Sequence, residues 1–217
     1  MEDVVKMNIY EGSSNSMNST EIKVAIPEDY KAKYEELESL ELSDLEISTV
    51  KGVIDRTKKA NVEYGAAHNG EAAIIDTDGN VRYFTSNLYA KVQIPADISE
   101  LMDKQENSIT LIHCHTNYTP PSPEDFSQLL RAGVSKIIIA GTNNIVYTVE
   151  IGDGELPDIG EFREAVNLIR KSTIQEVPEF LGAGDWTAAE LNYATIYEQA
   201  FEIKQKFKWK MRGGELE

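Results

Sequence analysis

Two of the three histidines of the chain and its only cysteine form the tripeptide His113-Cys114-His115, which ends the run "SITLIHCH". The branched and apolar residues of this run predict a buried β-strand. Side chains two positions apart on a strand point to the same face of a sheet, so both imidazoles would enter one space. Cys114 would then point to the opposite face, as a small core residue.

Asp125 stands ten residues after His115, near the start of a helix predicted for "SPEDFSQLLRAG". Two imidazoles and a carboxylate are ligands that suit zinc, with the fourth position left open for water. A zinc ion held in this way lowers the pKa of that water and produces a nucleophile for hydrolysis. The strand and the helix would have to bring these three side chains to one point.

Both patterns also have explanations that involve no metal. A histidine pair on an interior strand can be packed or hydrogen-bonded and nothing more. Ser122 and Asp125, with Pro123 at the first helical position, form a helix-capping signature. Because a cap can also present its side chains to a metal, the two explanations of Ser122 and Asp125 are compatible.

The rest of the chain predicts an α/β (α+β) fold, a mixed sheet flanked by helices with a helical C-terminal extension. Short strands are expected in "EIKVAI" and "LYAKVQI", a hairpin in "EAAIIDTDGNVRYF", and two further strands in "VSKIIIAGTNNIVYTVEIG". Helices are expected in "LEISTVKGVIDRTKKA", "ADISELMDKQEN" and "FREAVNLIRKST", and, after a break at "EVPEFLGAGDW", in "TAAELNYATIYEQAFEIKQKFKWK". We divide the chain into an acidic, partly flexible segment (1–44), a core domain (45–155) and the helical extension (156–217).

Composition narrows the classes of function. The 217 residues carry a net charge of -16, and a surface this acidic disfavours binding to nucleic acid. No run approaches the roughly 20 apolar residues that a membrane span needs, and the N-terminus lacks the pattern of a signal peptide, so we expect a cytoplasmic protein. Lys206, Lys208 and Lys210 fit cations near a helix C-terminus, with an anionic partner or a membrane surface as the alternative.

The spacing His113-x-His115-x6-Ser122-x2-Asp125, after an apolar strand and before an amphipathic helix, resembles the motif of the JAB/JAMM (MPN-fold) zinc metalloproteases. The common form of that motif has one more residue before the serine. The shorter spacing is closer to phage- and toxin-associated branches, although these usually have proline where this chain has Thr116. The order of "EAAIIDTDGNV", "KVQIP" and "LIHCH" extends the resemblance over about Leu45 to Gly152.

The resemblance implies one Zn²⁺ ion on His113, His115 and Asp125, and hydrolysis of a peptide or isopeptide bond by the water that zinc activates. It also implies that Ser122 stabilises the oxyanion and that a glutamate near the first core strand is the general base. Glu71, which opens "EAAIID", is the favoured candidate for the base, and Glu63 is the alternative. The substrate would be a polypeptide or a ubiquitin-like protein, in the cytoplasm or in a phage-encoded setting; the oligomeric state is not specified.

Other families fit less well. Amidohydrolases and PHP phosphoesterases also begin with two histidines on a strand, but they need further histidines downstream, and none follows His115. The third histidine, His68, is next to Asn69-Gly70 and is expected at a turn or on the surface. A serine or cysteine hydrolase is disfavoured because no nucleophile elbow is present. The alternative from a different class is a non-catalytic MPN-type scaffold or phage morphogenesis component, which would contain no stoichiometric zinc.

Overall fold

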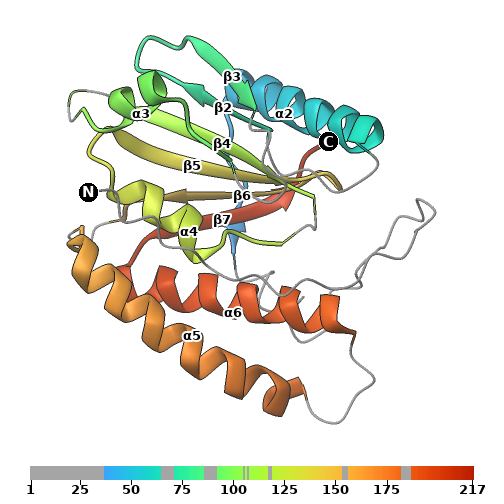
Figure 1. The fold of residues 1–217 in the computed structure, drawn as a ribbon, viewed down its shortest axis with the longest axis vertical. Helices are drawn as coiled ribbons and strands as arrows, with labels where there is room; N and C mark the ends of the chain where they lie inside the picture. The colour runs from blue at the N-terminus through green and yellow to red at the C-terminus, as the bar shows by residue number, and fades with distance from the viewer. Residues whose placement is uncertain are drawn as a thin grey trace.

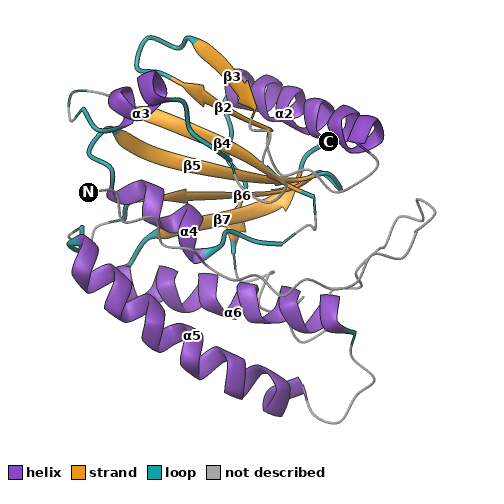
Figure 2. Ribbon diagram, in the orientation of Figure 1, coloured by secondary structure: helices purple, strands orange, loops and turns teal. Residues whose placement is uncertain are grey.

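The computed structural model describes residues 37–64, 71–85, 92–104, 106, 108–116, 119–152, 156–181 and 187–217. The strands are β1 (Glu38–Ser39), β2 (Glu71–Ile75), β3 (Val81–Thr85), β4 (Ile109–His115), β5 (Val134–Gly141), β6 (Ile145–Glu150) and β7 (Lys210–Glu215). The helices are α2 (Asp44–Tyr64), α3 (Ala96–Met102), α4 (Pro123–Ser127), which continues as a 3₁₀ turn (Gln128–Leu130), α5 (Ile159–Leu181) and α6 (Ala188–Phe207) (Figure 2). The predicted strand "EIKVAI" lies outside the described residues.

The seven strands form one mixed sheet in the order β1-β7-β6-β5-β4-β2-β3 (Figure 1). The pairs β4–β5 and β1–β7 are parallel, and the other pairs are antiparallel. The predicted fold class, a mixed sheet flanked by helices, is confirmed. Strand β1 comes from the predicted N-terminal segment and β7 from the predicted C-terminal extension, so all three segments contribute strands to the one sheet.

Each face of the sheet has its own hydrophobic core. Helix α2 covers one face, where Val50, Val53 and Ile54 pack with Ile112 and Cys114. Helices α3, α4 and α6 cover the opposite face, and α5 packs on the outer side of α6 (Figure 1). The alternation of side chains along β4 therefore decides which residues meet α2 and which meet α4.

The predicted hairpin is confirmed as β2 and β3, which pair from Glu71 opposite Thr85 to Ile75 opposite Val81. Its turn is stabilised by Asp76, whose carboxylate accepts hydrogen bonds from the main-chain N–H groups of Asp78 and Asn80. Gly79 adopts φ 81°, a left-handed conformation that glycine adopts without steric cost. This hairpin places β2 directly beside β4.

The C-terminal part differs from the prediction at two places. Helix α5 continues through Pro178 to Leu181, past the start of the predicted break, and keeps Val177 buried. The predicted last helix is confirmed as α6, but its predicted end at Lys210 is wrong, because α6 ends at Phe207 and β7 begins at Lys210. Trp209 and Met211 are buried two positions apart, which is the period of a strand. Among the described helices, none has both the length and the apolar character that crossing a membrane requires.

A substitution of Gly152, just after β6, tests whether the connection between α6 and β7 packs closely against this residue. A Cβ atom at Gly152 would lie 1.9 Å from the main-chain oxygen of Lys208. We expect Gly152→Ala to lower the free energy of unfolding by about 1–3 kcal/mol, measured by urea denaturation. Gly160→Ala, in the exposed first turn of α5, is the control and should be neutral or slightly stabilising. Equal stability of the two variants would contradict this packing.

Candidate metal centre

Strand β4 directs both of its histidines to the face that α4 covers. The rings of His113 and His115 meet edge to face, with their centroids 4.8 Å apart. Their side chains are 16% and 9% exposed, so the pair is largely buried. Cys114 is fully buried on the α2 face, as the strand period predicted.

The capping box at the start of α4 positions the carboxylate of Asp125. Oδ2 of Asp125 accepts hydrogen bonds from the main-chain N–H of Ser122 and from its hydroxyl, both at 2.7 Å. The main-chain N–H of Asp125 donates back to Ser122 Oγ at 3.3 Å. The predicted cap is confirmed, and it turns the carboxylate towards β4.

The carboxylate of Asp125 lies against both imidazoles. Its Oδ1 is 3.3 Å from Nδ1 of His113, and its Oδ2 is 3.4 Å from Nε2 of His115. One ligand atom from each of the three residues can be chosen so that all lie within 4.8 Å of one another. Two ligands of a tetrahedral zinc ion are separated by about 3.4 Å, so the donor types and their spacing fit zinc after small movements.

A backbone carbonyl near the site selects the tautomer of His115. Nδ1 of His115 is 2.9 Å from the carbonyl oxygen of Thr119, which is buried and is followed by the buried Pro120 and Pro121. A proton on Nδ1 donates to this carbonyl and leaves the lone pair of Nε2 directed to the point where a metal would bind. The hydroxyl of Thr119 also lies 3.1 Å from Nδ1. Sequence reasoning missed Thr119 because both contacts depend on the path of the chain after β4, which no local pattern shows.

The two central groups stabilise each other's charged forms. Burial raises the pKa of Asp125, but the adjacent His115 and His113 outweigh burial, so the pKa lies well below its ordinary value. Burial opposes the charged form of His115, but the Asp125 carboxylate and the Thr119 carbonyl outweigh it and raise its pKa. The carboxylate therefore stays ionised and attracts a cation, which is either a proton on His115 or a metal ion.

The structure does not bring Glu71 to this site. Ala72 is opposite His113 in the register of β2 and β4, so the side chain of Glu71, one position earlier, points to the α2 face. There its carboxylate accepts a hydrogen bond from Nε of Arg56 at 3.1 Å, and the Arg56 guanidinium lies over the ring of Tyr83. The predicted role of Glu71 as general base does not fit this geometry, because the sheet separates it from both histidines.

The other candidates do not replace Glu71 as the base. Glu63 is exposed in the last turn of α2, the helix on the far face of the sheet, and His68 lies outside the described residues.

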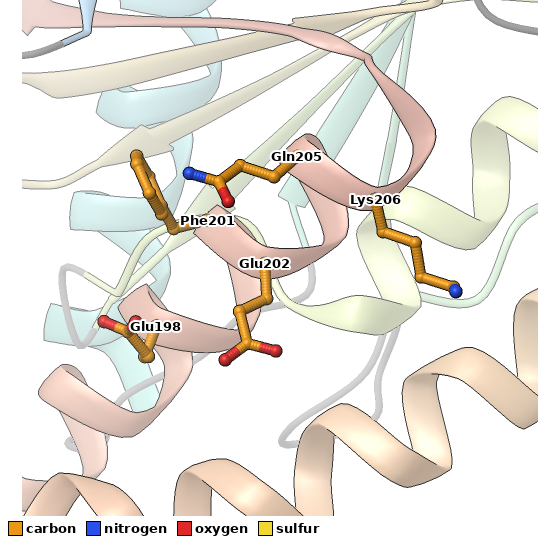
Figure 3. A pocket seen from close by; sticks show the side chains of 5 residues that line it. All are labelled: Glu198, Phe201, Glu202, Gln205 and Lys206. Carbon is orange, nitrogen blue, oxygen red and sulfur yellow. The ribbon is translucent and has the colours of Figure 1, made fainter.

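The structure also has a hollow along one side of α6, lined by Glu198, Phe201, Glu202, Gln205 and Lys206 (Figure 3). None of the predicted site residues lines this hollow, so it is separate from the metal centre.

Comparison of the chain with protein-family models, with curated proteins and with solved structures finds no match. The chemistry of the site is therefore argued from its geometry. Two imidazoles and an ionised carboxylate are donors that suit a divalent ion with an exchangeable fourth position. The hydroxyl of Ser122 is hydrogen-bonded to the same carboxylate.

The raised pKa of His115 predicts how zinc binding depends on pH. Below that pKa the imidazolium must lose a proton before Nε2 can bind a metal, while Asp125 stays ionised because its pKa is lowered. Zinc affinity should therefore fall as the pH falls, approaching about tenfold per pH unit once His115 is mostly protonated. Calorimetric titration with zinc from about pH 8 to pH 5.5 tests this expectation. Affinity that does not change over this range would exclude His115 as a ligand.

Proposed function

We propose that the protein is a zinc-dependent metallopeptidase or isopeptidase of the JAB/JAMM type. The observation that carries the proposal is the convergence of His113, His115 and Asp125, from a sheet and a separate helix, on one partly open point. The resemblance of the motif supports the same assignment, because Ser122 accompanies the three proposed ligands at the expected place. The proposed metal is one Zn²⁺ ion per chain.

Each residue of the site has a definite task in this proposal. When bound, zinc supplies a Lewis acid and brings the pKa of water close to neutrality. His113 and His115 bind through nitrogen, and the carbonyl of Thr119 holds the ring of His115 in the required tautomer. Asp125 supplies the negative charge. Ser122 supplies a hydroxyl that, on releasing its hydrogen bond to Asp125 Oδ2, would donate to the negative oxygen that develops on a carbonyl during hydrolysis.

The proposed substrate is a polypeptide or a ubiquitin-like protein. Hydrolysis of any peptide or isopeptide bond would use the same metal ligands and the same hydroxyl, so the site itself does not choose between substrates. The net charge of -16 disfavours nucleic acid as the partner. A cytoplasmic or phage-encoded setting belongs to the proposal, supported by a single cysteine that is buried and unpaired with another cysteine.

A non-catalytic scaffold is the second candidate, and one specific observation favours it. Glu71 is held by Arg56 on the opposite face of the sheet, so neither Glu71 nor Glu63 is placed to accept a proton at the metal centre. A scaffold requires no such base. A purified scaffold would also require no zinc, so metal content separates the two candidates.

The first expected result concerns metal content. Wild-type protein purified without chelator should contain about one zinc per chain by plasma mass spectrometry. The double variant His113→Ala/His115→Ala and the single variant Asp125→Asn should contain little or none. Glu190→Gln is the matched control, because Glu190 forms the same capping box with Thr187 at the exposed start of α6. Equal zinc in the wild type and the double variant would refute the site.

The second expected result concerns Ser122. Ser122→Ala should keep its zinc and lower kcat by about 10²–10³-fold on a peptide library or on di-ubiquitin, because a donor to the oxyanion is lost. The variant also loses a helix cap, which costs about 1 kcal/mol of stability. Thr187→Ala removes the corresponding cap of α6, where the hydroxyl is also 2.7 Å from its carboxylate, and should leave kcat unchanged. Activity of Ser122→Ala equal to that of the wild type contradicts the assigned role.

A further inference from the structure

The helix that carries Asp125 is too short to hold its own position. Helix α4 has five residues, and isolated helices shorter than about 12–15 residues are marginal in water. The capping box ties Asp125 to Ser122, which belongs to the same local segment. The distance between the Asp125 carboxylate and the histidines of β4 therefore depends on what packs against α4.

The residue that follows Asp125 provides one such contact. Phe126 is fully buried, and its ring stacks on that of Trp209, with centroids 5.7 Å apart and planes 14° from parallel. A stacked aromatic pair contributes about 0.5–1.5 kcal/mol beyond the area that it buries. Trp209 thus packs, within the hydrophobic core, on the residue next to Asp125 in α4.

Trp209 is itself fixed by the C-terminal part of the chain. It lies between α6 and β7, and its ring contacts Phe207 at 5.4 Å and Phe162 of α5 at 5.9 Å between centroids. We call Phe126, Phe162, Phe207 and Trp209 the aromatic cluster. Because β7 pairs with β6 in the sheet, the cluster connects α4 to a rigid part of the fold.

An ion pair ties α4 to α5 at a second point. Nη2 of Arg170, on α5, contacts Oε1 of Glu124, the residue that precedes Asp125. Arg170 is 27% exposed and Glu124 56% exposed, so we expect this pair to contribute less than the aromatic stack. The two residues that flank the carboxylate ligand in sequence, Glu124 and Phe126, are thus both held by the C-terminal segment.

We propose that Trp209 is a positioning residue of the metal centre, which sets zinc affinity by holding Asp125 in reach of His113 and His115, with Arg170 as a weaker second tie. This inference rests on the proposed zinc site and adds a role for residues 156–217. The histidines are held independently of the aromatic cluster, because they lie on the central strand β4, where His113 is paired on both sides and His115 is paired with β5. Loss of the cluster should therefore affect the carboxylate ligand and leave the two nitrogen ligands in place.

The test measures zinc affinity of the full-length protein by competition with a chromophoric chelator. Trp209→Leu should weaken zinc binding by about 10–100-fold, which is the usual effect of removing a group that orients a metal ligand. Trp209→Phe keeps an aromatic ring and should recover most of the affinity. Phe84→Leu is the control for lost packing, because Phe84 is buried in the same hydrophobic core but on β3; its affinity should equal that of the wild type.

The background variant Asp125→Ala shows whether Trp209 acts through the carboxylate. In that background Trp209→Leu should change zinc affinity by less than about twofold, because the ligand that it positions is already absent. The absorption spectrum of the Co²⁺-substituted protein gives a second readout: Trp209→Leu should move it towards the spectrum of Asp125→Ala. Arg170→Ala should weaken binding by about threefold in the wild-type background, and it decides the matter if Trp209→Leu does not fold.

The outcomes separate this inference from the proposed function. A wild-type protein that takes up no zinc removes the proposed function and this inference together. A wild-type protein that binds zinc, with Trp209→Leu and Arg170→Ala both at wild-type affinity, overturns the inference alone. A loss of affinity in Phe84→Leu as large as in Trp209→Leu overturns it as well, because the effect would then reflect stability rather than the position of Asp125.

Discussion

The contact of one buried carboxylate with two imidazoles is the interaction on which the site depends. Removing a carboxylate from water costs several kcal/mol unless a positive charge and hydrogen bonds compensate it. For Asp125 the hydrogen bonds come from Ser122, and the positive charge must lie between the carboxylate and the rings, which are 3.3 and 3.4 Å away. A proton on His115 meets that requirement, and so does a zinc ion. In the proposed enzyme, the zinc ion replaces the proton on His115 as the positive charge that compensates the Asp125 carboxylate.

The comparison of the two capping boxes shows how a common local structure becomes a candidate site. Ser122 with Asp125 and Thr187 with Glu190 have the same bonding pattern, with the same 2.7 Å contacts to the carboxylate. The cap of α6 is exposed and serves that helix. The cap of α4 faces β4, where two histidines outweigh the effect of burial and lower the pKa of its carboxylate well below the ordinary value. The difference lies in the packing around the cap, and the aromatic cluster is the part of that packing that reaches α4.

The sequence predicted the parts of the site that depend on local periodicity. The strand period placed His113 and His115 on one face and Cys114 on the other, and the capping signature located the start of α4. The sequence could not show on which face of the sheet Glu71 lies, because the face of a strand residue depends on the register with the neighbouring strand. A shift of one residue moves the side chain to the other side of the sheet. Nor could it show that Trp209 packs against α4, since that contact joins segments more than 80 residues apart in the chain.

The role of the C-terminal segment could not be predicted from the sequence for the same reason. The alternation of Trp209 and Met211 with charged residues is too short to distinguish a strand from a helix end without the partner strand β6. Once β7 is paired, the segment that follows the predicted core domain completes the sheet and supports the helix that carries Asp125. The fold class was therefore predictable from the sequence, whereas the dependence of the site on residues 156–217 was not.

Anomalous diffraction at the zinc absorption edge, from crystals of the protein loaded with one equivalent of zinc, tests the central claim most directly. The account predicts one strong peak, about 2.0–2.2 Å from Nδ1 of His113, Nε2 of His115 and a carboxylate oxygen of Asp125. A peak at any other place would contradict it. So would zinc-saturated crystals in which Asp125 still contacts both rings directly with no ion between them.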